Sequence, residues 1–304
     1  MRLGTSIDTD QPIDGVVASA RAAKDAGFAR VWPSQIFGVD ALTVWAVVAR
    51  EVDGIEFGTG VIPVHPRHPQ VLAQQALTVQ AISGGRLTLG IGLSHKVVVE
   101  GMWGYSYDAG ATYMHEYLDA LVPMLHGEVA NVHGDRVHAV TIGPVGPKGG
   151  TPPKLVIAAL GPVMLKLAAT MADGTVTWMT GIATLRDYVV PTITTAAAAA
   201  GRPSPSVIAS LPVCCTTDVA AANERINTAL AIYPTLPSYK AMLDKEGATA
   251  PADVALVGSK DQVVDALGQL AAAGVTDMGA AVIGSPDEQA ATVELLSEFS
   301  RREG

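Results

Sequence analysis

Cysteine is nearly absent from the sequence, and the two cysteines that occur, Cys214 and Cys215, are adjacent. Adjacent cysteines rarely form a structural disulfide, and stable disulfides belong to oxidising compartments. We therefore interpret both as small core residues of a predicted strand and not as redox groups. The segment from Met1 to Asp8 also lacks the charged-then-apolar pattern of a secretory leader, so a cytoplasmic protein is expected.

Positive charge and long apolar runs are scarce as well. Lys and Arg number 20 against 29 Asp and Glu, so the net charge is −9. Nucleic acid needs a basic surface and is not an expected partner, although this count leaves room for a local basic pocket that holds an anionic cofactor. No run approaches the roughly 20 apolar residues of a membrane span, so no membrane partner is expected either. A small-molecule substrate is the remaining kind of partner.

Aromatic residues make up only 5% of the chain, whereas hydrophobic residues make up 49% and charged residues 16%. Such a composition supports a large core built mainly from Ala, Val, Leu and Ile, and it excludes a disordered chain. The length of 304 residues is about twice that of a usual domain. Barrels of the (β/α)₈ type reach this length as one domain, so we expect a single barrel domain over residues 1–304.

Short apolar runs alternate with helical patterns along the whole chain. The predicted strands are Arg2–Ile7, Ala29–Trp32, Ile55–Val61, Leu87–Ile91, Leu155–Ala159, Thr175–Trp178, Val207–Val213 and Asp277–Val282. The predicted helices are Pro12–Ala26, Asp40–Arg50, Val71–Ile82, Tyr113–Leu125, Val163–Met171, Ala183–Ala200, Val219–Ile232, Val263–Ala273 and a last helix that ends near Ser300. This alternation predicts an α/β fold with a parallel barrel of the (β/α)₈ (TIM) type, and a doubly wound open sheet is the alternative.

Three segments interrupt the alternation. Gly92–Thr112 is long for a connection between a strand and a helix, and it could cover a substrate or pack against the insertion that follows. Gly127–Gly150 is rich in Gly and Pro and is interpreted as a hairpin-like insertion. Residues 234–250 hold an extra helical segment, Ser238–Gly247.

Several common catalytic motifs are missing. The phosphate loop G-x-x-x-x-G-K-[ST] and the nucleophile elbow G-x-S-x-G do not occur. Gly90-Ile91-Gly92 follows a strand, but His95 stands where the third glycine of a dinucleotide-binding loop is required. His65 and His68 lie among prolines without a nearby Cys or carboxylate, so no metal site is predicted.

Active sites of such barrels lie at the C-terminal ends of the strands. In this sequence those positions hold Ser34, Gln35, Gly60, Val61, His65, Arg67, Gly92, Ser94, His95, Lys96, Ala159, Leu160, Gly161, Trp178, Thr180 and Gly181. Glycines at a strand end allow a bulge or the close approach of a planar ligand, but a simple turn would look the same. The helix that opens at Gly161-Pro162 has free amides that attract phosphate, as ordinary helix starts also have.

Two groups of polar side chains stand out among these positions. His95 and Lys96 follow the fourth strand, where a histidine could be a general acid or donate to a ring carbonyl, or could simply be exposed. His65, Arg67 and His68 are the densest group of basic residues in the first half of the chain. They could collect an anionic tail or form a solvated loop face.

At these residues the chain resembles the luciferase-like monooxygenase superfamily. The matching segments follow one another over nearly the whole chain, and the resemblance is strongest to the actinobacterial branch that uses coenzyme F420, a deazaflavin. They are Gly58–Val61, Pro66–Pro69, Gln74–Thr78, Ser83–Gly92, Ala159–Pro162, Ala172–Gly174 and Ala200–Pro203. The resemblance implies a (β/α)₈ barrel with an insertion, and it favours a homodimer.

The resemblance also implies where a cofactor lies. The ring would rest against a bulge after the third strand, with a non-prolyl cis peptide that joins Gly60 and Val61 by position. The phosphate would lie near the loops after the fifth and sixth strands, at Ala159, Leu160 and Gly161 and at Thr180 and Gly181. Contacts from Ser34, His65, Arg67, Gly92, Lys96 and Trp178 complete the predicted cofactor site.

Two departures limit which reaction is expected. Ser34-Gln35 stands where bacterial luciferase and the sugar-phosphate dehydrogenases carry acidic and histidine residues, and Ser94-His95 stands where the dehydrogenases carry a carboxylate. We therefore expect hydride transfer between a deazaflavin and a small organic substrate, with His95 moving the proton and Gln35 and Ser94 donating to the ring edge.

Three alternatives remain open at this point. The first is an FMN-dependent monooxygenase of the same superfamily, and the second is a flavin-binding protein without catalytic activity. The third is an unrelated barrel enzyme such as an aldolase, which would need a Schiff-base lysine or paired carboxylates at the strand ends. Neither of these is evident in the sequence.

Overall fold

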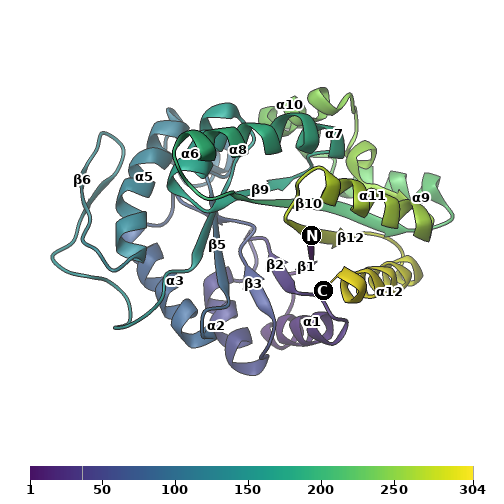
Figure 1. The fold of residues 1–304 in the computed structure, drawn as a ribbon, viewed down its shortest axis with the longest axis horizontal. Helices are drawn as coiled ribbons and strands as arrows, with labels where there is room; N and C mark the ends of the chain where they lie inside the picture. The colour runs from purple at the N-terminus through teal and green to yellow at the C-terminus, as the bar shows by residue number, and fades with distance from the viewer. Residues whose placement is uncertain (36, 304) are drawn as a thin grey trace.

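The computed structural model describes residues 1–35 and 37–303. Among them, eight parallel strands close into a barrel, because the last strand pairs with both the first strand and its predecessor (Figure 1). The strands are β1 (Arg2–Ile7), β2 (Arg30–Pro33), β3 (Glu56–Gly58), β5 (Leu87–Gly92), β8 (Lys154–Ala158), β9 (Gly174–Trp178), β10 (Ser206–Cys215) and β12 (Asp277–Val282). The predicted (β/α)₈ barrel is confirmed.

Helices surround the closed sheet on its outer side (Figure 1). They are α1 (Ile13–Asp25), α2 (Ala41–Glu51), α3 (Pro69–Ser83), α4 (Lys96–Gly101), α5 (Gly110–Leu125), α6 (Pro162–Met171), α7 (Ile182–Thr184), α8 (Val190–Ala199), α9 (Val219–Ala229), α10 (Pro237–Glu246), α11 (Lys260–Ala272) and α12 (Pro286–Glu303). Helix α3 ends at Gly84, which adopts the left-handed conformation that glycine favours. Helix α11 begins with a capping box, in which the side chains of Ser259 and Gln262 bond to each other's backbone amides.

The third strand does not run unbroken from Ile55 to Val61. It stops at Gly58 and resumes as the short β4 (Ile62–Pro63), which also pairs with β5. Between the two pieces the Thr59 hydroxyl replaces a ladder bond: it donates to the Gly90 carbonyl at 2.7 Å and accepts from the Gly90 amide at 2.8 Å. The apolar pattern could not reveal this break, because the bulge keeps buried residues on both sides of it.

Two segments that interrupt the predicted alternation contain short elements of their own. The long connection after β5 contains the short helix α4, and α5 begins at Gly110 and not at Tyr113. The insertion at 127–150 contains an antiparallel hairpin of β6 (Asn131–His133) and β7 (His138–Val140), which projects from the barrel beside α5 (Figure 1).

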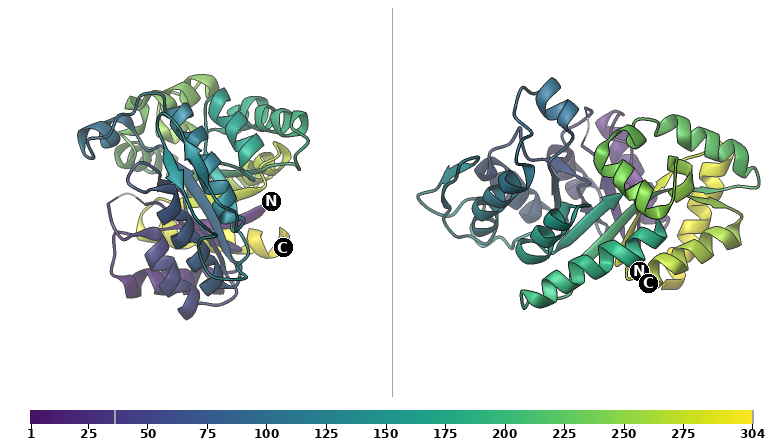
Figure 2. Two further views of the ribbon diagram at one scale, coloured as in Figure 1. Left: turned by 90° about the vertical axis from the view of Figure 1, so that its left-hand side faces the viewer. Right: turned by 90° about the horizontal axis from the view of Figure 1, so that it is seen from above.

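The C-terminal half departs from the expected pattern in two further places. The strand β11 (Leu256–Gly258) pairs with the end of β10, which extends to Cys215. The helix predicted over 183–200 contains one π-helical turn, η1 (Leu185–Val189), between α7 and α8. Both views of Figure 2 show the start of β1 near the end of α12.

The core has an outer and an inner part, because successive side chains of a strand point to opposite faces. Outward side chains such as Leu89 and Ile91 pack under the helices in one large cluster. A separate, smaller cluster inside the barrel joins Trp32, Val156 and Ile208. The barrel is therefore filled at mid-height, and only its two ends remain to form sites.

Cys214 is buried and Cys215 half-buried, and burial raises the pKa of both thiols.

No helix among the described residues has the length and apolar character needed to cross a membrane.

Candidate active site at the C-terminal end of the barrel

The floor of the candidate site is the indole ring of Trp32. It fills the centre of the barrel, where the neighbouring strands carry Gly4, Gly58 and Gly279. A methyl group on Gly58 would lie 2.0 Å from the ring, and one on Gly279 would lie 3.3 Å from it, so the glycines make the space that the indole occupies. Trp32 is only 3% exposed.

Above this floor the inward positions are small and open to solvent. Ser6 is exposed, and Ala158, Ser210 and Ala281 are half-buried, although their neighbours one level below are buried. Side chains of this size cannot close the end of an eight-stranded barrel. The C-terminal end of the barrel is therefore a hollow whose floor is Trp32.

One wall of the hollow is the bulge at Gly60 and Val61. The peptide bond between these residues is cis, as the resemblance implies, and the Gly60 amide donates to the Pro33 carbonyl at 2.9 Å. The Val61 side chain turns toward β5, where a methyl group on Gly92 would lie 2.8 Å from it. A methyl group on Gly60 would meet only the Pro33 oxygen, at 3.9 Å. The Gly60 side of the bulge is thus flat backbone that faces open space.

A stack of rings forms the next part of the wall. His65 lies with its ring 4.5 Å from that of Tyr113, at 13° between the planes, and 6.1 Å from that of Tyr107. The Tyr107 hydroxyl donates to the Ser94 carbonyl at 3.0 Å, which fixes the connection after β5. His65 is 8% exposed, and burial lowers its pKa. This ring is therefore neutral near pH 7.

His95 begins α4 and continues the wall toward α10. Its ring centre lies 5.7 Å from that of Tyr239. Burial lowers the pKa of His95 as well, and no salt bridge to a carboxylate opposes this effect among the described residues. A neutral imidazole can take a proton from a bound hydroxyl group at neutral pH.

The far side of the wall comes from residues 233–239, which were not among the predicted site residues. Tyr239 of α10 packs edge-on against Tyr233 of the short helix η2 (Tyr233–Thr235), with ring centres 4.9 Å apart. Tyr233 in turn lies 5.9 Å from Trp178, at the end of β9. The sequence does carry a signal that could have placed this segment in the site. Aromatic residues are only 5% of the chain, and two of them fall in this proline-rich segment.

We call these seven rings the aromatic wall; its members are His65, His95, Tyr107, Tyr113, Trp178, Tyr233 and Tyr239. Burial raises the pKa of each of its tyrosines, so the wall is uncharged at neutral pH. A hollow bounded by flat backbone and by neutral rings suits a planar cofactor and a substrate without charge.

The basic residues after β4 do not form one cationic cluster. His65 is neutral, and His68 caps α3 by accepting from the Gln70 amide at 3.2 Å. The Arg67 guanidinium forms an ion pair with Asp40, at the start of α2. Of the two alternatives for this loop, the engagement of His68 and Arg67 in local structure favours a loop face over a joint anion-collecting cluster.

The remaining polar residues predicted for the site differ in how freely a ligand in the hollow could reach them. Ser34 is exposed, and the Gln35 side-chain oxygen accepts from the Ala41 amide at 3.2 Å. Ser94 adopts the left-handed conformation, with a φ of 62°. Lys96 is exposed and lies 3.7 Å from Glu100 on the surface of α4. Its ammonium group is held at the rim and is not aimed into the hollow by any described contact.

The two helix starts that could hold a phosphate differ clearly. At Gly161, which is exposed, a methyl group would meet nothing within 4 Å, and no side chain caps α6. At Gly181 the carboxylate of Glu246 fills the corresponding space. Glu246 accepts from the amides of Ala183 at 3.0 Å and Thr184 at 2.6 Å. The start of α6 is therefore open to an anion, whereas the start of α7 already has one. Ala159 is buried and Leu160 half-buried beside the open start, and Thr180 is buried beside the capped one.

No group of three or more His, Cys, Asp or Glu side chains that could hold a metal ion occurs in residues 1–35 and 37–303.

The amino-acid sequence of the chain is similar to those of known proteins. A family model described as luciferase-like monooxygenase matches residues 1–299. A Mycobacterium tuberculosis protein with the provisional name of coenzyme F420-dependent oxidoreductase is 28% identical over an alignment of 301 residues, covering 91% of this chain and 82% of that protein.

Two solved structures are similar in fold. The coenzyme F420-dependent tetrahydromethanopterin reductase of Methanopyrus kandleri matches with a TM-score of 0.82 at 22% identity, over 99% of both chains. The oxygenating constituent of 3,6-diketocamphane monooxygenase from Pseudomonas putida, in complex with FMN, matches with a TM-score of 0.77 at 18% identity, over 98% of this chain and 97% of that one.

Proposed function

Because the chain belongs to the luciferase-like monooxygenase family, a family of enzymes, we propose that it is a coenzyme F420-dependent oxidoreductase acting on a small uncharged substrate. The observation that carries this proposal is the hollow itself. Flat backbone at Gly60 faces open space above Trp32, opposite a wall of neutral rings. Flat backbone and neutral rings of this kind suit the binding of a tricyclic ring.

The residues present fit a deazaflavin. The ring would lie against the Gly60–Val61 bulge, near Gly92 and the small side chain of Ala158. The phosphate would lie at the open start of α6, beside Gly161, and not at Gly181, where Glu246 already satisfies the free amides. When bound, a deazaflavin supplies two-electron hydride transfer and reacts poorly with oxygen.

Residues of this chain would move the proton and exclude water. His95 is neutral and reaches the hollow from the start of α4, so it would accept the proton of a substrate hydroxyl during oxidation or return it during reduction. Ser94 and the Gln35 amide would donate to the ring edge. Tyr107, Tyr113 and Tyr239 would surround the substrate and keep water from it.

Support for the deazaflavin comes from the Mycobacterium tuberculosis relative, which carries coenzyme F420 in its name and spans nearly the whole chain. The second candidate is an FMN-dependent monooxygenase, because a protein of the same fold is known in complex with FMN. The two candidates differ in their reactivity with oxygen, since a reduced flavin reacts with oxygen readily and a reduced deazaflavin reacts with it poorly.

The test is a titration of the purified protein with coenzyme F420, FMN and FAD, followed by cofactor fluorescence. We expect saturable binding of F420 with a dissociation constant at least about tenfold lower than that for FMN. Each reduced cofactor is then incubated with a panel of small alcohols and ketones while oxygen is recorded. Substrate-dependent oxygen uptake with FMN would establish the monooxygenase instead. Tight binding without turnover on any substrate would favour the non-catalytic alternative.

Three predictions from the sequence belong to the same proposal: a single barrel domain, a homodimer and a cytoplasmic location. Light scattering of the purified protein at several concentrations would establish its mass. A monomer at all concentrations would remove the homodimer.

A further inference from the structure

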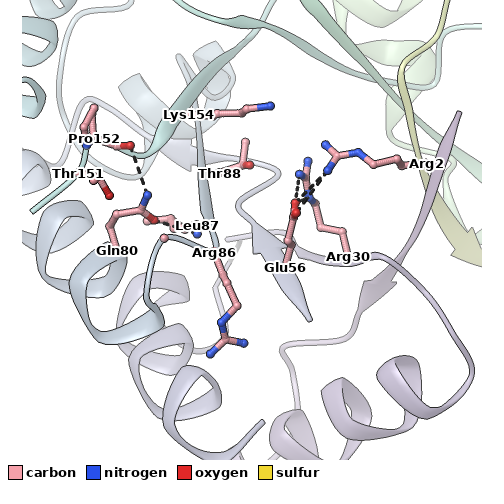
Figure 3. Close-up of a pocket in the computed structure, with 11 residues that line it drawn as sticks. Arg2, Arg30, Glu56, Gln80, Arg86, Leu87, Thr88, Thr151, Pro152 and Lys154 are labelled. Atoms are coloured by element: carbon pink, nitrogen blue, oxygen red, sulfur yellow. Dashed lines mark hydrogen bonds and ion pairs between the residues drawn. The ribbon is translucent and has the colours of Figure 1, made fainter. Parts of the chain in front are cut away.

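The opposite end of the barrel holds a second cavity, of about 310 Å³, below Trp32. It opens at the N-terminal ends of β1, β2, β3, β5 and β8, with the end of α3 and the chain before β8 at its side (Figure 3). It lies on the other side of the inner cluster from the proposed cofactor site, so a ligand here would be distinct from cofactor and substrate.

Most of the charge around this cavity is balanced. Arg30 pairs with Glu56 and lies 3.3 Å from an Asp277 oxygen. Arg2 lies 3.1 Å from Glu56 and 2.8 Å from Asp277. Figure 3 shows Arg2 and Arg30 reaching the Glu56 carboxylate from the same side. These four side chains form a neutral network, of which Arg30 and Asp277 are each only 4% exposed.

Arg86 contributes little to the cavity, although it borders it. Its guanidinium donates to the carbonyls of Ala49, Val52, Ile55 and Ser83 at 2.8–2.9 Å. Figure 3 shows its side chain directed away from Thr88 and Lys154. Its donors are therefore committed to holding the end of α2 and the turn before β5.

Two polar groups that border the cavity, by contrast, are not held by hydrogen bonds or ion pairs to the residues that the structure describes. Within the described part of the chain, the Lys154 ammonium forms no hydrogen bond or ion pair, although its charge helps to lower the pKa of Glu56, and the Thr88 hydroxyl forms no hydrogen bond. They stand on adjacent strands and are register partners, Thr88 opposite Lys154 (Figure 3). The Gln80 amide beside them is already used, by the Pro152 carbonyl at 3.3 Å and the Leu87 amide at 3.0 Å. The cavity thus has one cation with uncommitted donors, Lys154, and one free hydroxyl donor, Thr88, on the same wall.

We propose that this cavity binds a small oxyanion, a carboxylate or a phosphate, between the Lys154 ammonium and the Thr88 hydroxyl. Lysine binds such groups as a point charge, and a hydroxyl adds a directed hydrogen bond. Arg2 and Arg30 are left to their ion pairs with Glu56 and Asp277 and are not required as ligands of the anion. This site does not depend on the proposed function, because the cavity does not reach the C-terminal hollow.

The experiment is calorimetric titration of the purified protein, without added cofactor, with inorganic phosphate and separately with acetate and citrate at constant ionic strength. We expect saturable binding of at least one of these anions, and a melting temperature that rises with its concentration. Lys154→Met should weaken that binding at least about tenfold, because it removes the charge but keeps the length of the side chain. Thr88→Val, which keeps the shape of the threonine, should weaken it less.

Lys240→Met is the matched control, since Lys240 is also an exposed lysine but lies on α10, where it pairs with Asp244. It should bind the anion as the unchanged protein does. Melting curves in sodium chloride alone would show that all three variants fold. Equal affinity of Lys154→Met and the unchanged protein, or the absence of saturable binding by the unchanged protein, would overturn the proposal.

Discussion

The two ends of the barrel are built from the same eight strands, yet they differ in every property that matters for chemistry. The N-terminal end carries Arg2, Arg30, Glu56 and Asp277 in a network of ion pairs. The C-terminal end carries small inward side chains and a wall of rings that are neutral near pH 7. The charged side chains at the N-terminal end hold the strands together. At the C-terminal end, the backbone and the histidines remain available to a ligand. This division agrees with the general rule that barrel enzymes keep stability and catalysis at opposite ends.

The largest effect that separates the two ends is expected from His95→Ala. Removing a positioned proton acceptor should lower kcat about 10²–10⁴-fold with the dissociation constant of the cofactor unchanged. Steady-state kinetics and the fluorescence titration measure the two quantities. His115→Ala is the control, because His115 is exposed on α5 and pairs with Asp119. An unchanged kcat in His95→Ala would remove this residue from the mechanism.

At the other end, Asp277→Ala should act on stability alone. Arg30 is buried and would lose one of its two carboxylate partners, so the free energy of unfolding should fall by about 3 kcal/mol, the lower end for a broken buried pair. Chemical denaturation measures this loss. Asp187→Ala breaks an exposed pair with Arg186 and should change stability very little. Loss of cofactor affinity in folded Asp277→Ala would contradict the separation of the two ends.

The pH dependence sharpens the role of the neutral histidine. The pKa of His95 is lowered below its ordinary value of 6.5, so the acceptor form is present at neutral pH and is lost as the pH falls through the lowered pKa. The rate of substrate oxidation should therefore be flat near pH 7 and fall by up to about tenfold per pH unit in the acid range. Reduction should show the opposite trend. A profile that persists in His95→Ala would assign the titration to another group.

Gly60→Ala tests the flat face of the bulge. The added methyl group would meet only the Pro33 oxygen in the protein, but it would stand where the ring is expected to lie. The dissociation constant of F420 should rise about tenfold, which corresponds to the cost of modest overpacking, while the melting temperature stays the same. Gly143→Ala is the control, because a methyl group on Gly143 would have no neighbour within 4 Å. Unchanged affinity in Gly60→Ala would place the ring elsewhere.

The smallest effect is expected from Glu246→Gln. The carboxylate caps the amides of Ala183 and Thr184, so its neutralisation should lower the free energy of unfolding by about 1 kcal/mol. F420 affinity should stay within about twofold, since the phosphate is assigned to the start of α6. A clear gain in affinity would mean that Glu246 competes with the phosphate at α7.

Local sequence patterns were sufficient where structure depends on near neighbours. The alternation of strands and helices, the stop of α3 at Gly84 and the capping box at Ser259 follow from periodicity and from residues a few positions apart. The cis bond at Gly60–Val61 was implied by resemblance and not by any pattern in the residues themselves. The break in the third strand escaped prediction, because it depends on Thr59 bonding to a residue of another strand.

By itself, then, the sequence determined the barrel and the family to which the chain belongs, and it predicted the end of the barrel at which the chemistry is expected. Tertiary structure alone decided which side chains meet there: Tyr239 beside His95, Glu246 at the start of α7, and Asp40 against Arg67. Each of these contacts joins segments that are far apart in the chain, and no local propensity specifies such a pairing. Packing around a common centre brings them together, and the same packing leaves Lys154 and Thr88 free at the opposite end.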